Sequence, residues 1–174
     1  MADPKDSTSK ALAGVILAID YGRARIGLAI ADLATRMPQP LGTLERVNRN
    51  EDMRRLRETA RDHGVKQIVV GLPLRLDGTQ SEMADEAARF AERVRKQLGV
   101  PVAMVDERLT SWEAERLMEE IGGRVLRKSS PVTGRKIKAE SGSMTVDSVA
   151  AAVILKEFLD RETAPGAEAA EEQQ

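Results

Sequence analysis

The order of short apolar runs and amphipathic segments is the feature that most constrains the fold of this chain. Four runs are short, apolar and contain β-branched residues, which is typical of buried strands, and a fifth run alternates in polarity. Amphipathic or capped segments between and after these runs predict four helices. Three strands in succession, followed by alternating helices and strands, predict an α/β fold with a five-stranded mixed sheet and helices on both faces.

The predicted boundaries follow from where each pattern begins and ends. Strands are predicted at residues 15–19, 26–31, 40–47, 67–71 and 101–105. Helices are predicted at residues 50–63, 81–98, 110–121 and 145–159. Gly64 and Gly99 directly follow two of these helices, as expected for residues that end a helix, and His63 is interpreted as a capping or surface residue.

One domain is predicted, because 174 residues match the size of a single folding unit. It is assigned to residues 13–160, with a disordered N-terminus at 1–12 and a disordered acidic tail at 161–174, whose polar composition leaves little to bury. Residues 122–143 are rich in Gly, Ser, Lys and Arg without periodicity, which predicts a flexible basic loop. No leader or membrane-spanning segment is recognisable, so an intracellular location is expected.

The amino-acid composition limits the chemistry of the chain. There is no Cys and only one His, which excludes thiolate zinc sites, cysteine nucleophiles and histidine clusters. A bound metal would therefore depend on carboxylates and water, which favours Mg²⁺ or Mn²⁺. Aromatic residues make up 2% of the chain, which argues against a base-stacking surface. The net charge of −1 shows no basic excess, although several acids lie in the tail.

Acidic residues at strand ends and at a helix start are the candidates for catalysis. Asp20 ends the first strand, Asp106 and Glu107 end the fifth, and Asp147 lies in the first turn of the last helix. Such positions are where α/β sheets gather ligand groups. Three clustered carboxylates could hold two divalent ions that activate water and stabilise the leaving oxygen of a phosphodiester. Each acid alone is also compatible with a turn or a helix start.

Basic residues provide candidate contacts to a nucleic-acid backbone. Those beside the acidic segments or the turn after the fourth strand are Arg23, Arg25, Arg75 and Arg108. Those in the basic loop are Lys128, Arg135 and Lys136. Both groups could hold phosphates, and both are also compatible with solvated surface charge.

Four segments carry a resemblance to a known family. The first is Ile-Asp-Tyr-Gly-Arg-Ala-Arg-Ile-Gly-Leu-Ala at 19–29, and the second is Gly-Leu-Pro-Leu at 71–74 with Asp-Gly-Thr at 77–79. The third is Asp-Glu-Arg-Leu-Thr-Ser at 106–111, and the fourth is Val-Asp-Ser-Val-Ala-Ala at 146–151. In this order they are similar to the motifs of the YqgF family, also called RuvX, of Holliday junction resolvases and pre-16S rRNA nucleases.

The resemblance implies a ribonuclease H-like fold and a nuclease site formed by Asp20, Glu107 and Asp147. It also implies a bacterial cytoplasmic protein that matures the 5′ end of the small-subunit rRNA precursor. Two segments depart from the family pattern: Arg75 stands where Asn is usual, and Ser-Met-Thr at 143–145 precedes the last motif where a basic stretch is usual. These departures affect the expected contacts to the nucleic-acid backbone and not the three acids.

The resulting hypothesis is a metal-dependent endonuclease that acts on structured RNA, with Asp20 bridging the metal ions and Glu107 and Asp147 each completing one coordination shell. One alternative is the same chemistry on four-way DNA, and another is a non-catalytic RNA-binding factor for ribosome assembly. A phosphotransferase of the actin-like class shares the Asp-x-Gly turn but requires two such domains. Both a monomer and a homodimer are compatible with the sequence.

Overall fold

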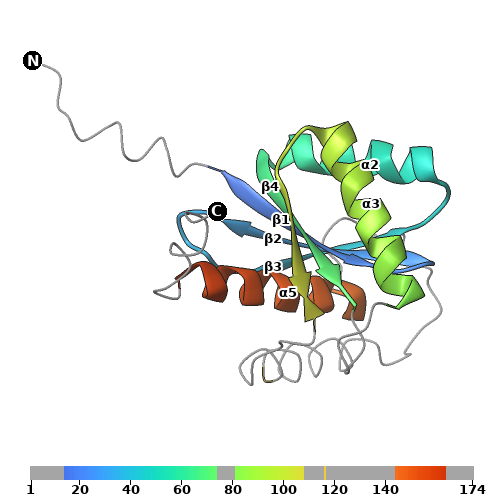
Figure 1. The fold of residues 1–174 in the computed structure, drawn as a ribbon. Coiled ribbons are helices and arrows are strands. Elements are labelled where there is room, and N and C mark those ends of the chain that lie inside the picture. Colours follow the sequence, from blue (N-terminus) through green and yellow to red (C-terminus); the bar gives the residue numbers. More distant parts are fainter. Residues whose placement is uncertain (1–13, 74–80, 108–115, 117–143, 164–174) are drawn as a thin grey trace, which may run out of the picture.

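Five strands form one mixed sheet in the computed structural model, which describes residues 14–73, 81–107, 116 and 144–163 (Figure 1). The strands are β1 (Val15–Tyr21), β2 (Arg25–Asp32), β3 (Gln39–Glu45), β4 (Val65–Leu72) and β5 (Val102–Asp106). Their order is β3-β2-β1-β4-β5, so β1 lies at the centre. The pairs β1–β2 and β2–β3 are antiparallel, whereas β1–β4 and β4–β5 are parallel. The predicted five-stranded mixed sheet is therefore confirmed.

Three helices complete the described part of the chain: α2 (Arg49–Asp62), α3 (Glu82–Leu98) and α5 (Val146–Thr163). The side chain of Asn48 caps the start of α2, and that of Ser81 caps the start of α3. Gly99 ends α3 in the left-handed conformation, with φ of 67°. α2 and α3 cover one face of the sheet and α5 covers the other (Figure 1). Helices on both faces were expected from the order of the elements.

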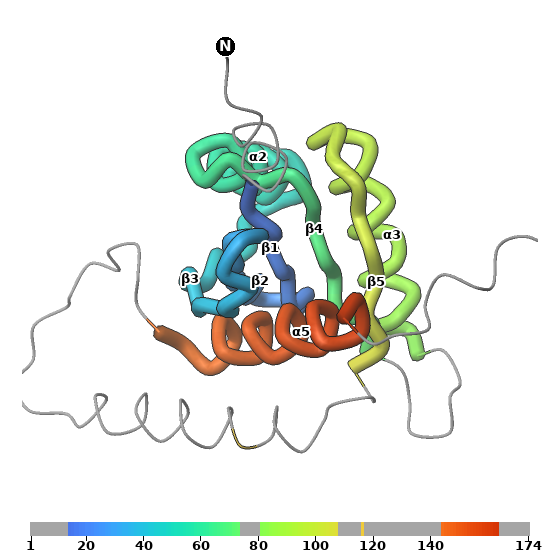
Figure 2. The backbone as a smooth tube through the Cα atoms, turned by 90° about the vertical axis from the view of Figure 1, so that its left-hand side faces the viewer, coloured from blue at the N-terminus to red at the C-terminus, as the bar shows by residue number. Residues whose placement is uncertain are grey.

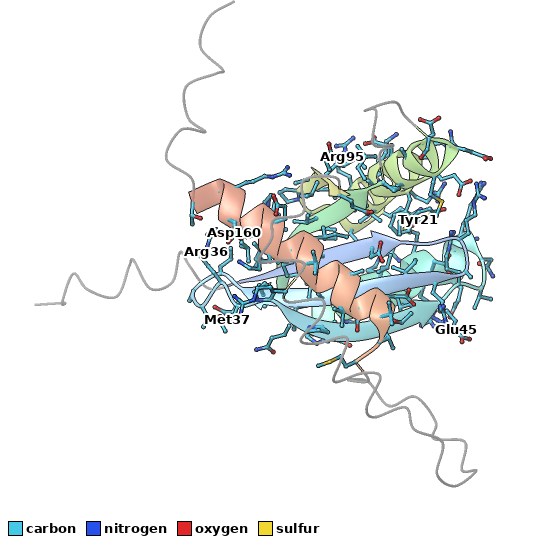
Figure 3. All side chains as sticks on the ribbon, turned by 90° about the horizontal axis from the view of Figure 1, so that it is seen from below. Tyr21, Arg36, Met37, Glu45, Arg95 and Asp160 are labelled. Atoms are coloured by element: carbon cyan, nitrogen blue, oxygen red, sulfur yellow. The ribbon has the colours of Figure 1, made fainter. Side chains whose placement is uncertain are left out.

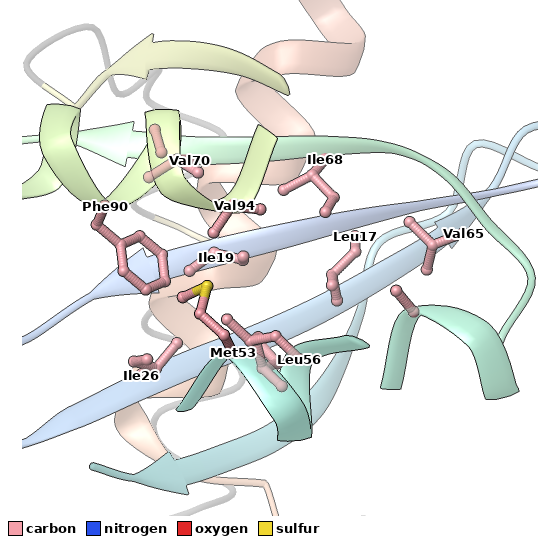
Figure 4. Close-up of a cluster of buried hydrophobic side chains, with 13 residues drawn as sticks. Leu17, Ile19, Ile26, Met53, Leu56, Val65, Ile68, Val70, Phe90 and Val94 are labelled. Carbon is pink, nitrogen blue, oxygen red and sulfur yellow. The ribbon is translucent and has the colours of Figure 1, made fainter. Parts of the chain in front are cut away.

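Two apolar clusters fill the space between the sheet and its helices. β1 divides its side chains between them, because Leu17 and Ile19 pack with α2 and α3, whereas Ile16 and Ala18 pack with α5. Figure 4 shows the first cluster, in which Phe90 of α3 packs beside the strands. Side chains alternate between the two faces of a strand, so burial on both faces explains why residues 15–19 of β1 are all apolar.

α5 crosses the second face of the sheet obliquely (Figure 3), and Figure 2 shows the helix from another side. Hydrogen bonds hold α5 near both of its ends. At its start, the Ser148 backbone N–H donates to Thr145 Oγ1 at 3.1 Å, and the Thr145 hydroxyl contacts the hydroxyl of Thr43 on β3. At its end, the Arg36 guanidinium donates to the carbonyl of Leu159 at 2.8 Å. α5 is therefore fixed relative to β2 and β3.

Some boundaries differ from the prediction. α5 extends to Thr163, beyond the predicted end at residue 159, so residues 161–163 are helical although they were assigned to the tail. Its last turn is extended by the Thr163 hydroxyl, which donates to the Leu159 carbonyl at 3.2 Å. β3 ends at Glu45, two residues early, because the next side chain turns toward α2. β4 begins at Val65, two residues before its predicted start.

Several predicted segments lie outside the described residues. They are the helix at 110–121 except for residue 116, the basic loop at 122–143, the N-terminus at 1–12 and the tail beyond 163. Apart from residues 161–163, which belong to α5, the limits of the predicted domain and of its disordered ends stay predictions. None of the helices in the described ranges has the length and apolarity that a membrane span requires.

A buried ion pair joins the end of β3 to the first turns of α2. Asp52 is 3% exposed, and its carboxylate accepts hydrogen bonds from Arg46 Nε at 3.0 Å and from the Val47 backbone N–H at 3.1 Å. The Arg46 guanidinium also donates to the Tyr21 hydroxyl at 2.9 Å and lies 4.9 Å from the centre of the Tyr21 ring. Because Tyr21 directly follows Asp20, this network fixes the carboxyl end of β1.

The substitution Asp52→Ala is expected to lower the free energy of unfolding by about 3 kcal/mol, because it leaves the half-buried Arg46 guanidinium without its carboxylate. Glu58→Ala is the matched control, since Glu58 pairs with Arg54 on the same helix but is 45% exposed. Its expected effect is within about 0.5 kcal/mol. Urea denaturation at neutral pH measures the free energy of unfolding of both variants. Equal losses would contradict the explanation that burial makes the Arg46–Asp52 pair matter more than the exposed pair.

Candidate active site

Asp20 lies near the carboxyl end of β1, on the face of the sheet that α5 covers. Ile16 and Ala18, which precede it on the same side of the strand, pack in the α5 cluster. In the antiparallel register with β2, Asp20 is the partner of Gly27. The parallel register with β4, continued by one residue, places Gly71 on its other side. Asp20 is therefore bordered on both neighbouring strands by residues without side chains.

Glu107 and Asp147 approach Asp20 from these two sides. Glu107 directly follows β5, and its carboxylate lies over Gly71. Asp147 lies in the first turn of α5, and its backbone carbonyl lies over Gly27. The structure thus brings the three predicted acids to one region, with Asp20 in the middle.

Burial and mutual repulsion raise the pKa values of two of these acids. Burial raises the pKa of Asp20 to about 6, and the negative charge of Asp147 adds to the effect. Burial likewise raises the pKa of Glu107 to about 7, with contributions from the charges of Asp20 and Asp106. Asp20 therefore interacts electrostatically with both other candidates. Raised carboxylate pKa values mean that the protein alone compensates these negative charges poorly.

The chemistry of this donor set fits a hard divalent cation. Carboxylate oxygens are the ligands that Mg²⁺ and Mn²⁺ prefer, and a cation would offset the repulsion that raises the pKa values of Asp20 and Glu107. In the part of the chain that the structure describes, no group of three potential ligand side chains meets closely enough to hold an ion.

The two described arginine candidates have different partners. Arg25 Nε lies 3.1 Å from Oδ2 of Asp147, so this side chain belongs to the acidic region. Arg23 instead pairs with Glu86 on α3 at 2.8 Å and with Glu82 at 3.3 Å. These two glutamates were not predicted as partners of Arg23, because two acids four residues apart at a helix start are only a weak signal. The candidates that lie outside the described residues are Arg75, Arg108, Lys128, Arg135 and Lys136.

Sequence comparisons identify related proteins over most of the chain. The family model of RuvX, described as Holliday junction resolvase, matches residues 14–161. A protein of Anaeromyxobacter dehalogenans named "Putative pre-16S rRNA nuclease" is 43% identical over 145 residues, which cover 83% of this chain and 96% of that protein. A protein of Koribacter versatilis with the same name is 40% identical over 151 residues, which cover 87% of this chain and 90% of that protein.

A comparison with solved structures supports the fold assignment. The chain resembles T. thermophilus RuvC, solved in complex with a Holliday junction substrate, with a TM-score of 0.50. The similarity covers 87% of this chain and 98% of the RuvC chain at 16% sequence identity. At this level of identity the likeness concerns the fold, and the ribonuclease H-like fold that the motifs implied is confirmed.

The substitution Asp20→Asn is expected to stabilise the fold at high pH but not at low pH. Between the ordinary pKa of 3.8 and the folded value of about 6, the folded state keeps a proton that the unfolded state releases, so stability falls as the pH rises through this window. Removing the carboxylate removes this penalty, which amounts to about 1–3 kcal/mol at about pH 8 and shrinks toward zero at about pH 4.

Urea denaturation without divalent ions at the two pH values measures this effect. Asp62→Asn is the matched control, because Asp62 is a carboxylate at the end of α2 that is 62% exposed. A far smaller change in the free energy of unfolding is expected from it. A gain from Asp20→Asn of the same size at both pH values would contradict the explanation by burial and repulsion.

Proposed function

Because the chain belongs to the RuvX family, as its four motifs indicate, we propose that it is a metal-dependent endonuclease that hydrolyses phosphodiester bonds at the 5′ end of pre-16S rRNA. The observation that carries this proposal is the approach of Glu107 and Asp147 to Asp20 from opposite sides. The names of the curated relatives, which match nearly their full length, support the choice of substrate. A ribosomal RNA precursor as substrate implies a cytoplasmic protein.

The three acids have distinct roles in this proposal. Asp20, which lies between the other two, would be the ligand shared by two divalent cations, Mg²⁺ or Mn²⁺, and Glu107 and Asp147 would each complete one ligand set. Cations held there supply the charge that activates water and stabilises the leaving oxygen. Burial of Asp20 and Glu107 lowers the local dielectric and so strengthens the attraction between carboxylate and cation. The same burial couples ionisation of the acids to cation binding.

Arg25 is the described residue best placed to contact a substrate phosphate. Its side chain is 62% exposed and already lies at the acidic region through its contact with Asp147. When Asp147 serves as a metal ligand, the guanidinium becomes available for a phosphate next to the site. Arg23 would first have to leave Glu86 and Glu82. The further residues proposed to contact the nucleic-acid backbone are Arg75, Arg108, Lys128, Arg135 and Lys136.

Four-way DNA is the second candidate substrate. The family model is described by Holliday junction resolution, and the same three acids would serve that reaction. A resolvase that cuts both sides of a symmetric junction favours a homodimer, whereas a single cut in an RNA leader suits a monomer. A non-catalytic RNA-binding assembly factor is the third candidate, and it predicts binding without cleavage.

Mg²⁺ is expected to stabilise the wild-type protein through the acidic site. At a concentration tenfold above its Kd, the expected rise in Tm is about 3–6 °C. Asp20→Asn is expected to lose most of this shift, because it removes the central ligand, while Asp62→Asn keeps it. Thermal unfolding followed by circular dichroism measures the three proteins. Equal shifts in wild type and Asp20→Asn would mean that the cation binds elsewhere.

Cleavage of a labelled pre-16S rRNA 5′ leader tests the reaction itself. With Mg²⁺, Asp20→Asn is expected to lower kcat/KM by on the order of 100-fold or more, since several kcal/mol of transition-state stabilisation depend on a metal ligand. Unlabelled four-way junction DNA in the same assay separates the substrates. Faster cleavage of the junction than of the leader would favour the resolvase, and tight RNA binding without cleavage would favour the assembly factor.

A further inference from the structure

Both strands next to Asp20 carry a glycine at the level of its side chain. Gly27 on β2 is the register partner of Asp20, and Gly71 on β4 follows Val70, which is the partner of Ile19. Neither glycine has a positive φ, so a left-handed turn does not explain its presence. Glycine inside a strand often marks a close approach of another segment.

The space above Gly27 is filled by the backbone of α5. A Cβ atom added to Gly27 would lie 2.0 Å from the carbonyl oxygen of Asp147 and 2.4 Å from its carbonyl carbon. These distances are far shorter than any van der Waals contact, and the main chain of a packed helix cannot yield by rotating a side chain. Any side chain at position 27 would therefore lift the start of α5, and Asp147 with it, from the sheet.

The space above Gly71 is filled by side chains. A Cβ atom added there would lie 2.3 Å from Oε1 of Glu107 and 2.6 Å from Cδ1 of Ile154 on α5. Both atoms are the far ends of flexible side chains. A methyl group at position 71 would therefore push the Glu107 carboxylate aside while the strand and the helix backbone keep their places.

The geometry points to Gly27 and Gly71 as positioning residues of the acidic site: each leaves the space through which one acid reaches Asp20, the first for the backbone of Asp147 and the second for the carboxylate of Glu107. This inference rests on the proposed function in taking the three acids as the site, but the contacts themselves can be tested without nuclease activity. The two glycines act differently, because one accommodates backbone and the other accommodates side chains.

Double-mutant cycles in thermal unfolding test these contacts. Gly71→Ala is expected to lower the Tm, and Glu107→Ala in the same chain is expected to restore about half of the loss, because it removes the atom nearest to the added methyl group. Adding Ile154→Val removes the second crowded atom and restores most of the remainder. Gly27→Ala is expected to lower the Tm more, and Asp147→Ala restores none of that loss, since the backbone carbonyl stays in place.

Cation affinity tests the positioning role. Gly71→Ala is expected to weaken Mn²⁺ binding, measured by electron paramagnetic resonance, by about tenfold or more, as for residues that orient metal ligands. Gly14→Ala is the matched control, because its added Cβ would lie 2.6 Å from Cγ of Lys66, beside the end of β1 that is remote from Asp20. It should lower the Tm without changing Mn²⁺ affinity. With RNA, Gly71→Ala should lower kcat and leave RNA affinity without divalent ions unchanged.

Two results would overturn the inference: additive Tm losses in the Gly71–Glu107 cycle, or wild-type Mn²⁺ affinity in Gly71→Ala. Restoration of Gly27→Ala by Asp147→Ala would overturn the assignment for Gly27. If the wild-type protein binds no Mn²⁺, the proposed nuclease function fails, and the thermal cycles still decide whether the glycines hold the acids. If Gly27→Ala does not fold, the Gly71–Glu107 cycle alone decides whether the inference stands.

Discussion

The packing of α5 on the sheet requires small residues on both sides of the contact. Ala151 on the helix and Ala18 on β1 are fully buried at this interface, and Gly27 extends the run of small residues to the start of the helix. The helix axis can therefore lie close to the strands, and its first turn rests directly on β2. Because Asp147 belongs to that turn, the same contact that buries one face of the sheet also completes the acidic site around Asp20.

The acidic site lowers the free energy of unfolding, and contacts elsewhere in the structure offset this loss. Buried carboxylates with raised pKa values, such as Asp20 and Glu107, oppose folding when they ionise. In the strand that carries Asp20, the preceding residues Ile16–Ile19 are apolar and buried. Its end is fixed by Tyr21, whose ring lies 4.9 Å from that of Phe90 and whose hydroxyl accepts a hydrogen bond from Arg46. A rigid strand thus holds a charge arrangement that a flexible strand would relax.

Features with local signals could be predicted from the sequence. The apolar run of β1 and the glycine after α3 mark their elements, and Asp20, Glu107 and Asp147 each combine a position at the end of an element with a recognisable motif. Two features could not be predicted: the packing of side chains over Gly71, and the ion pairs that Arg23 forms with glutamates on α3. Each depends on which distant segments of the chain meet in space. The end of α5 was missed for a related reason, since its last turn is set by backbone acceptors and not by apolar periodicity.

The position of α5 in the chain affects how the protein is made. α5 follows all five strands, yet it covers the face formed largely by β1 and β2, and the Arg36–Leu159 hydrogen bond joins residues 123 positions apart. Until the ribosome has delivered α5, that apolar face is uncovered and open to chaperones and proteases, as is usual for long-range folds. Asp147 lies on this same helix. The docking of α5 therefore covers the apolar face and adds Asp147 to the other two acids.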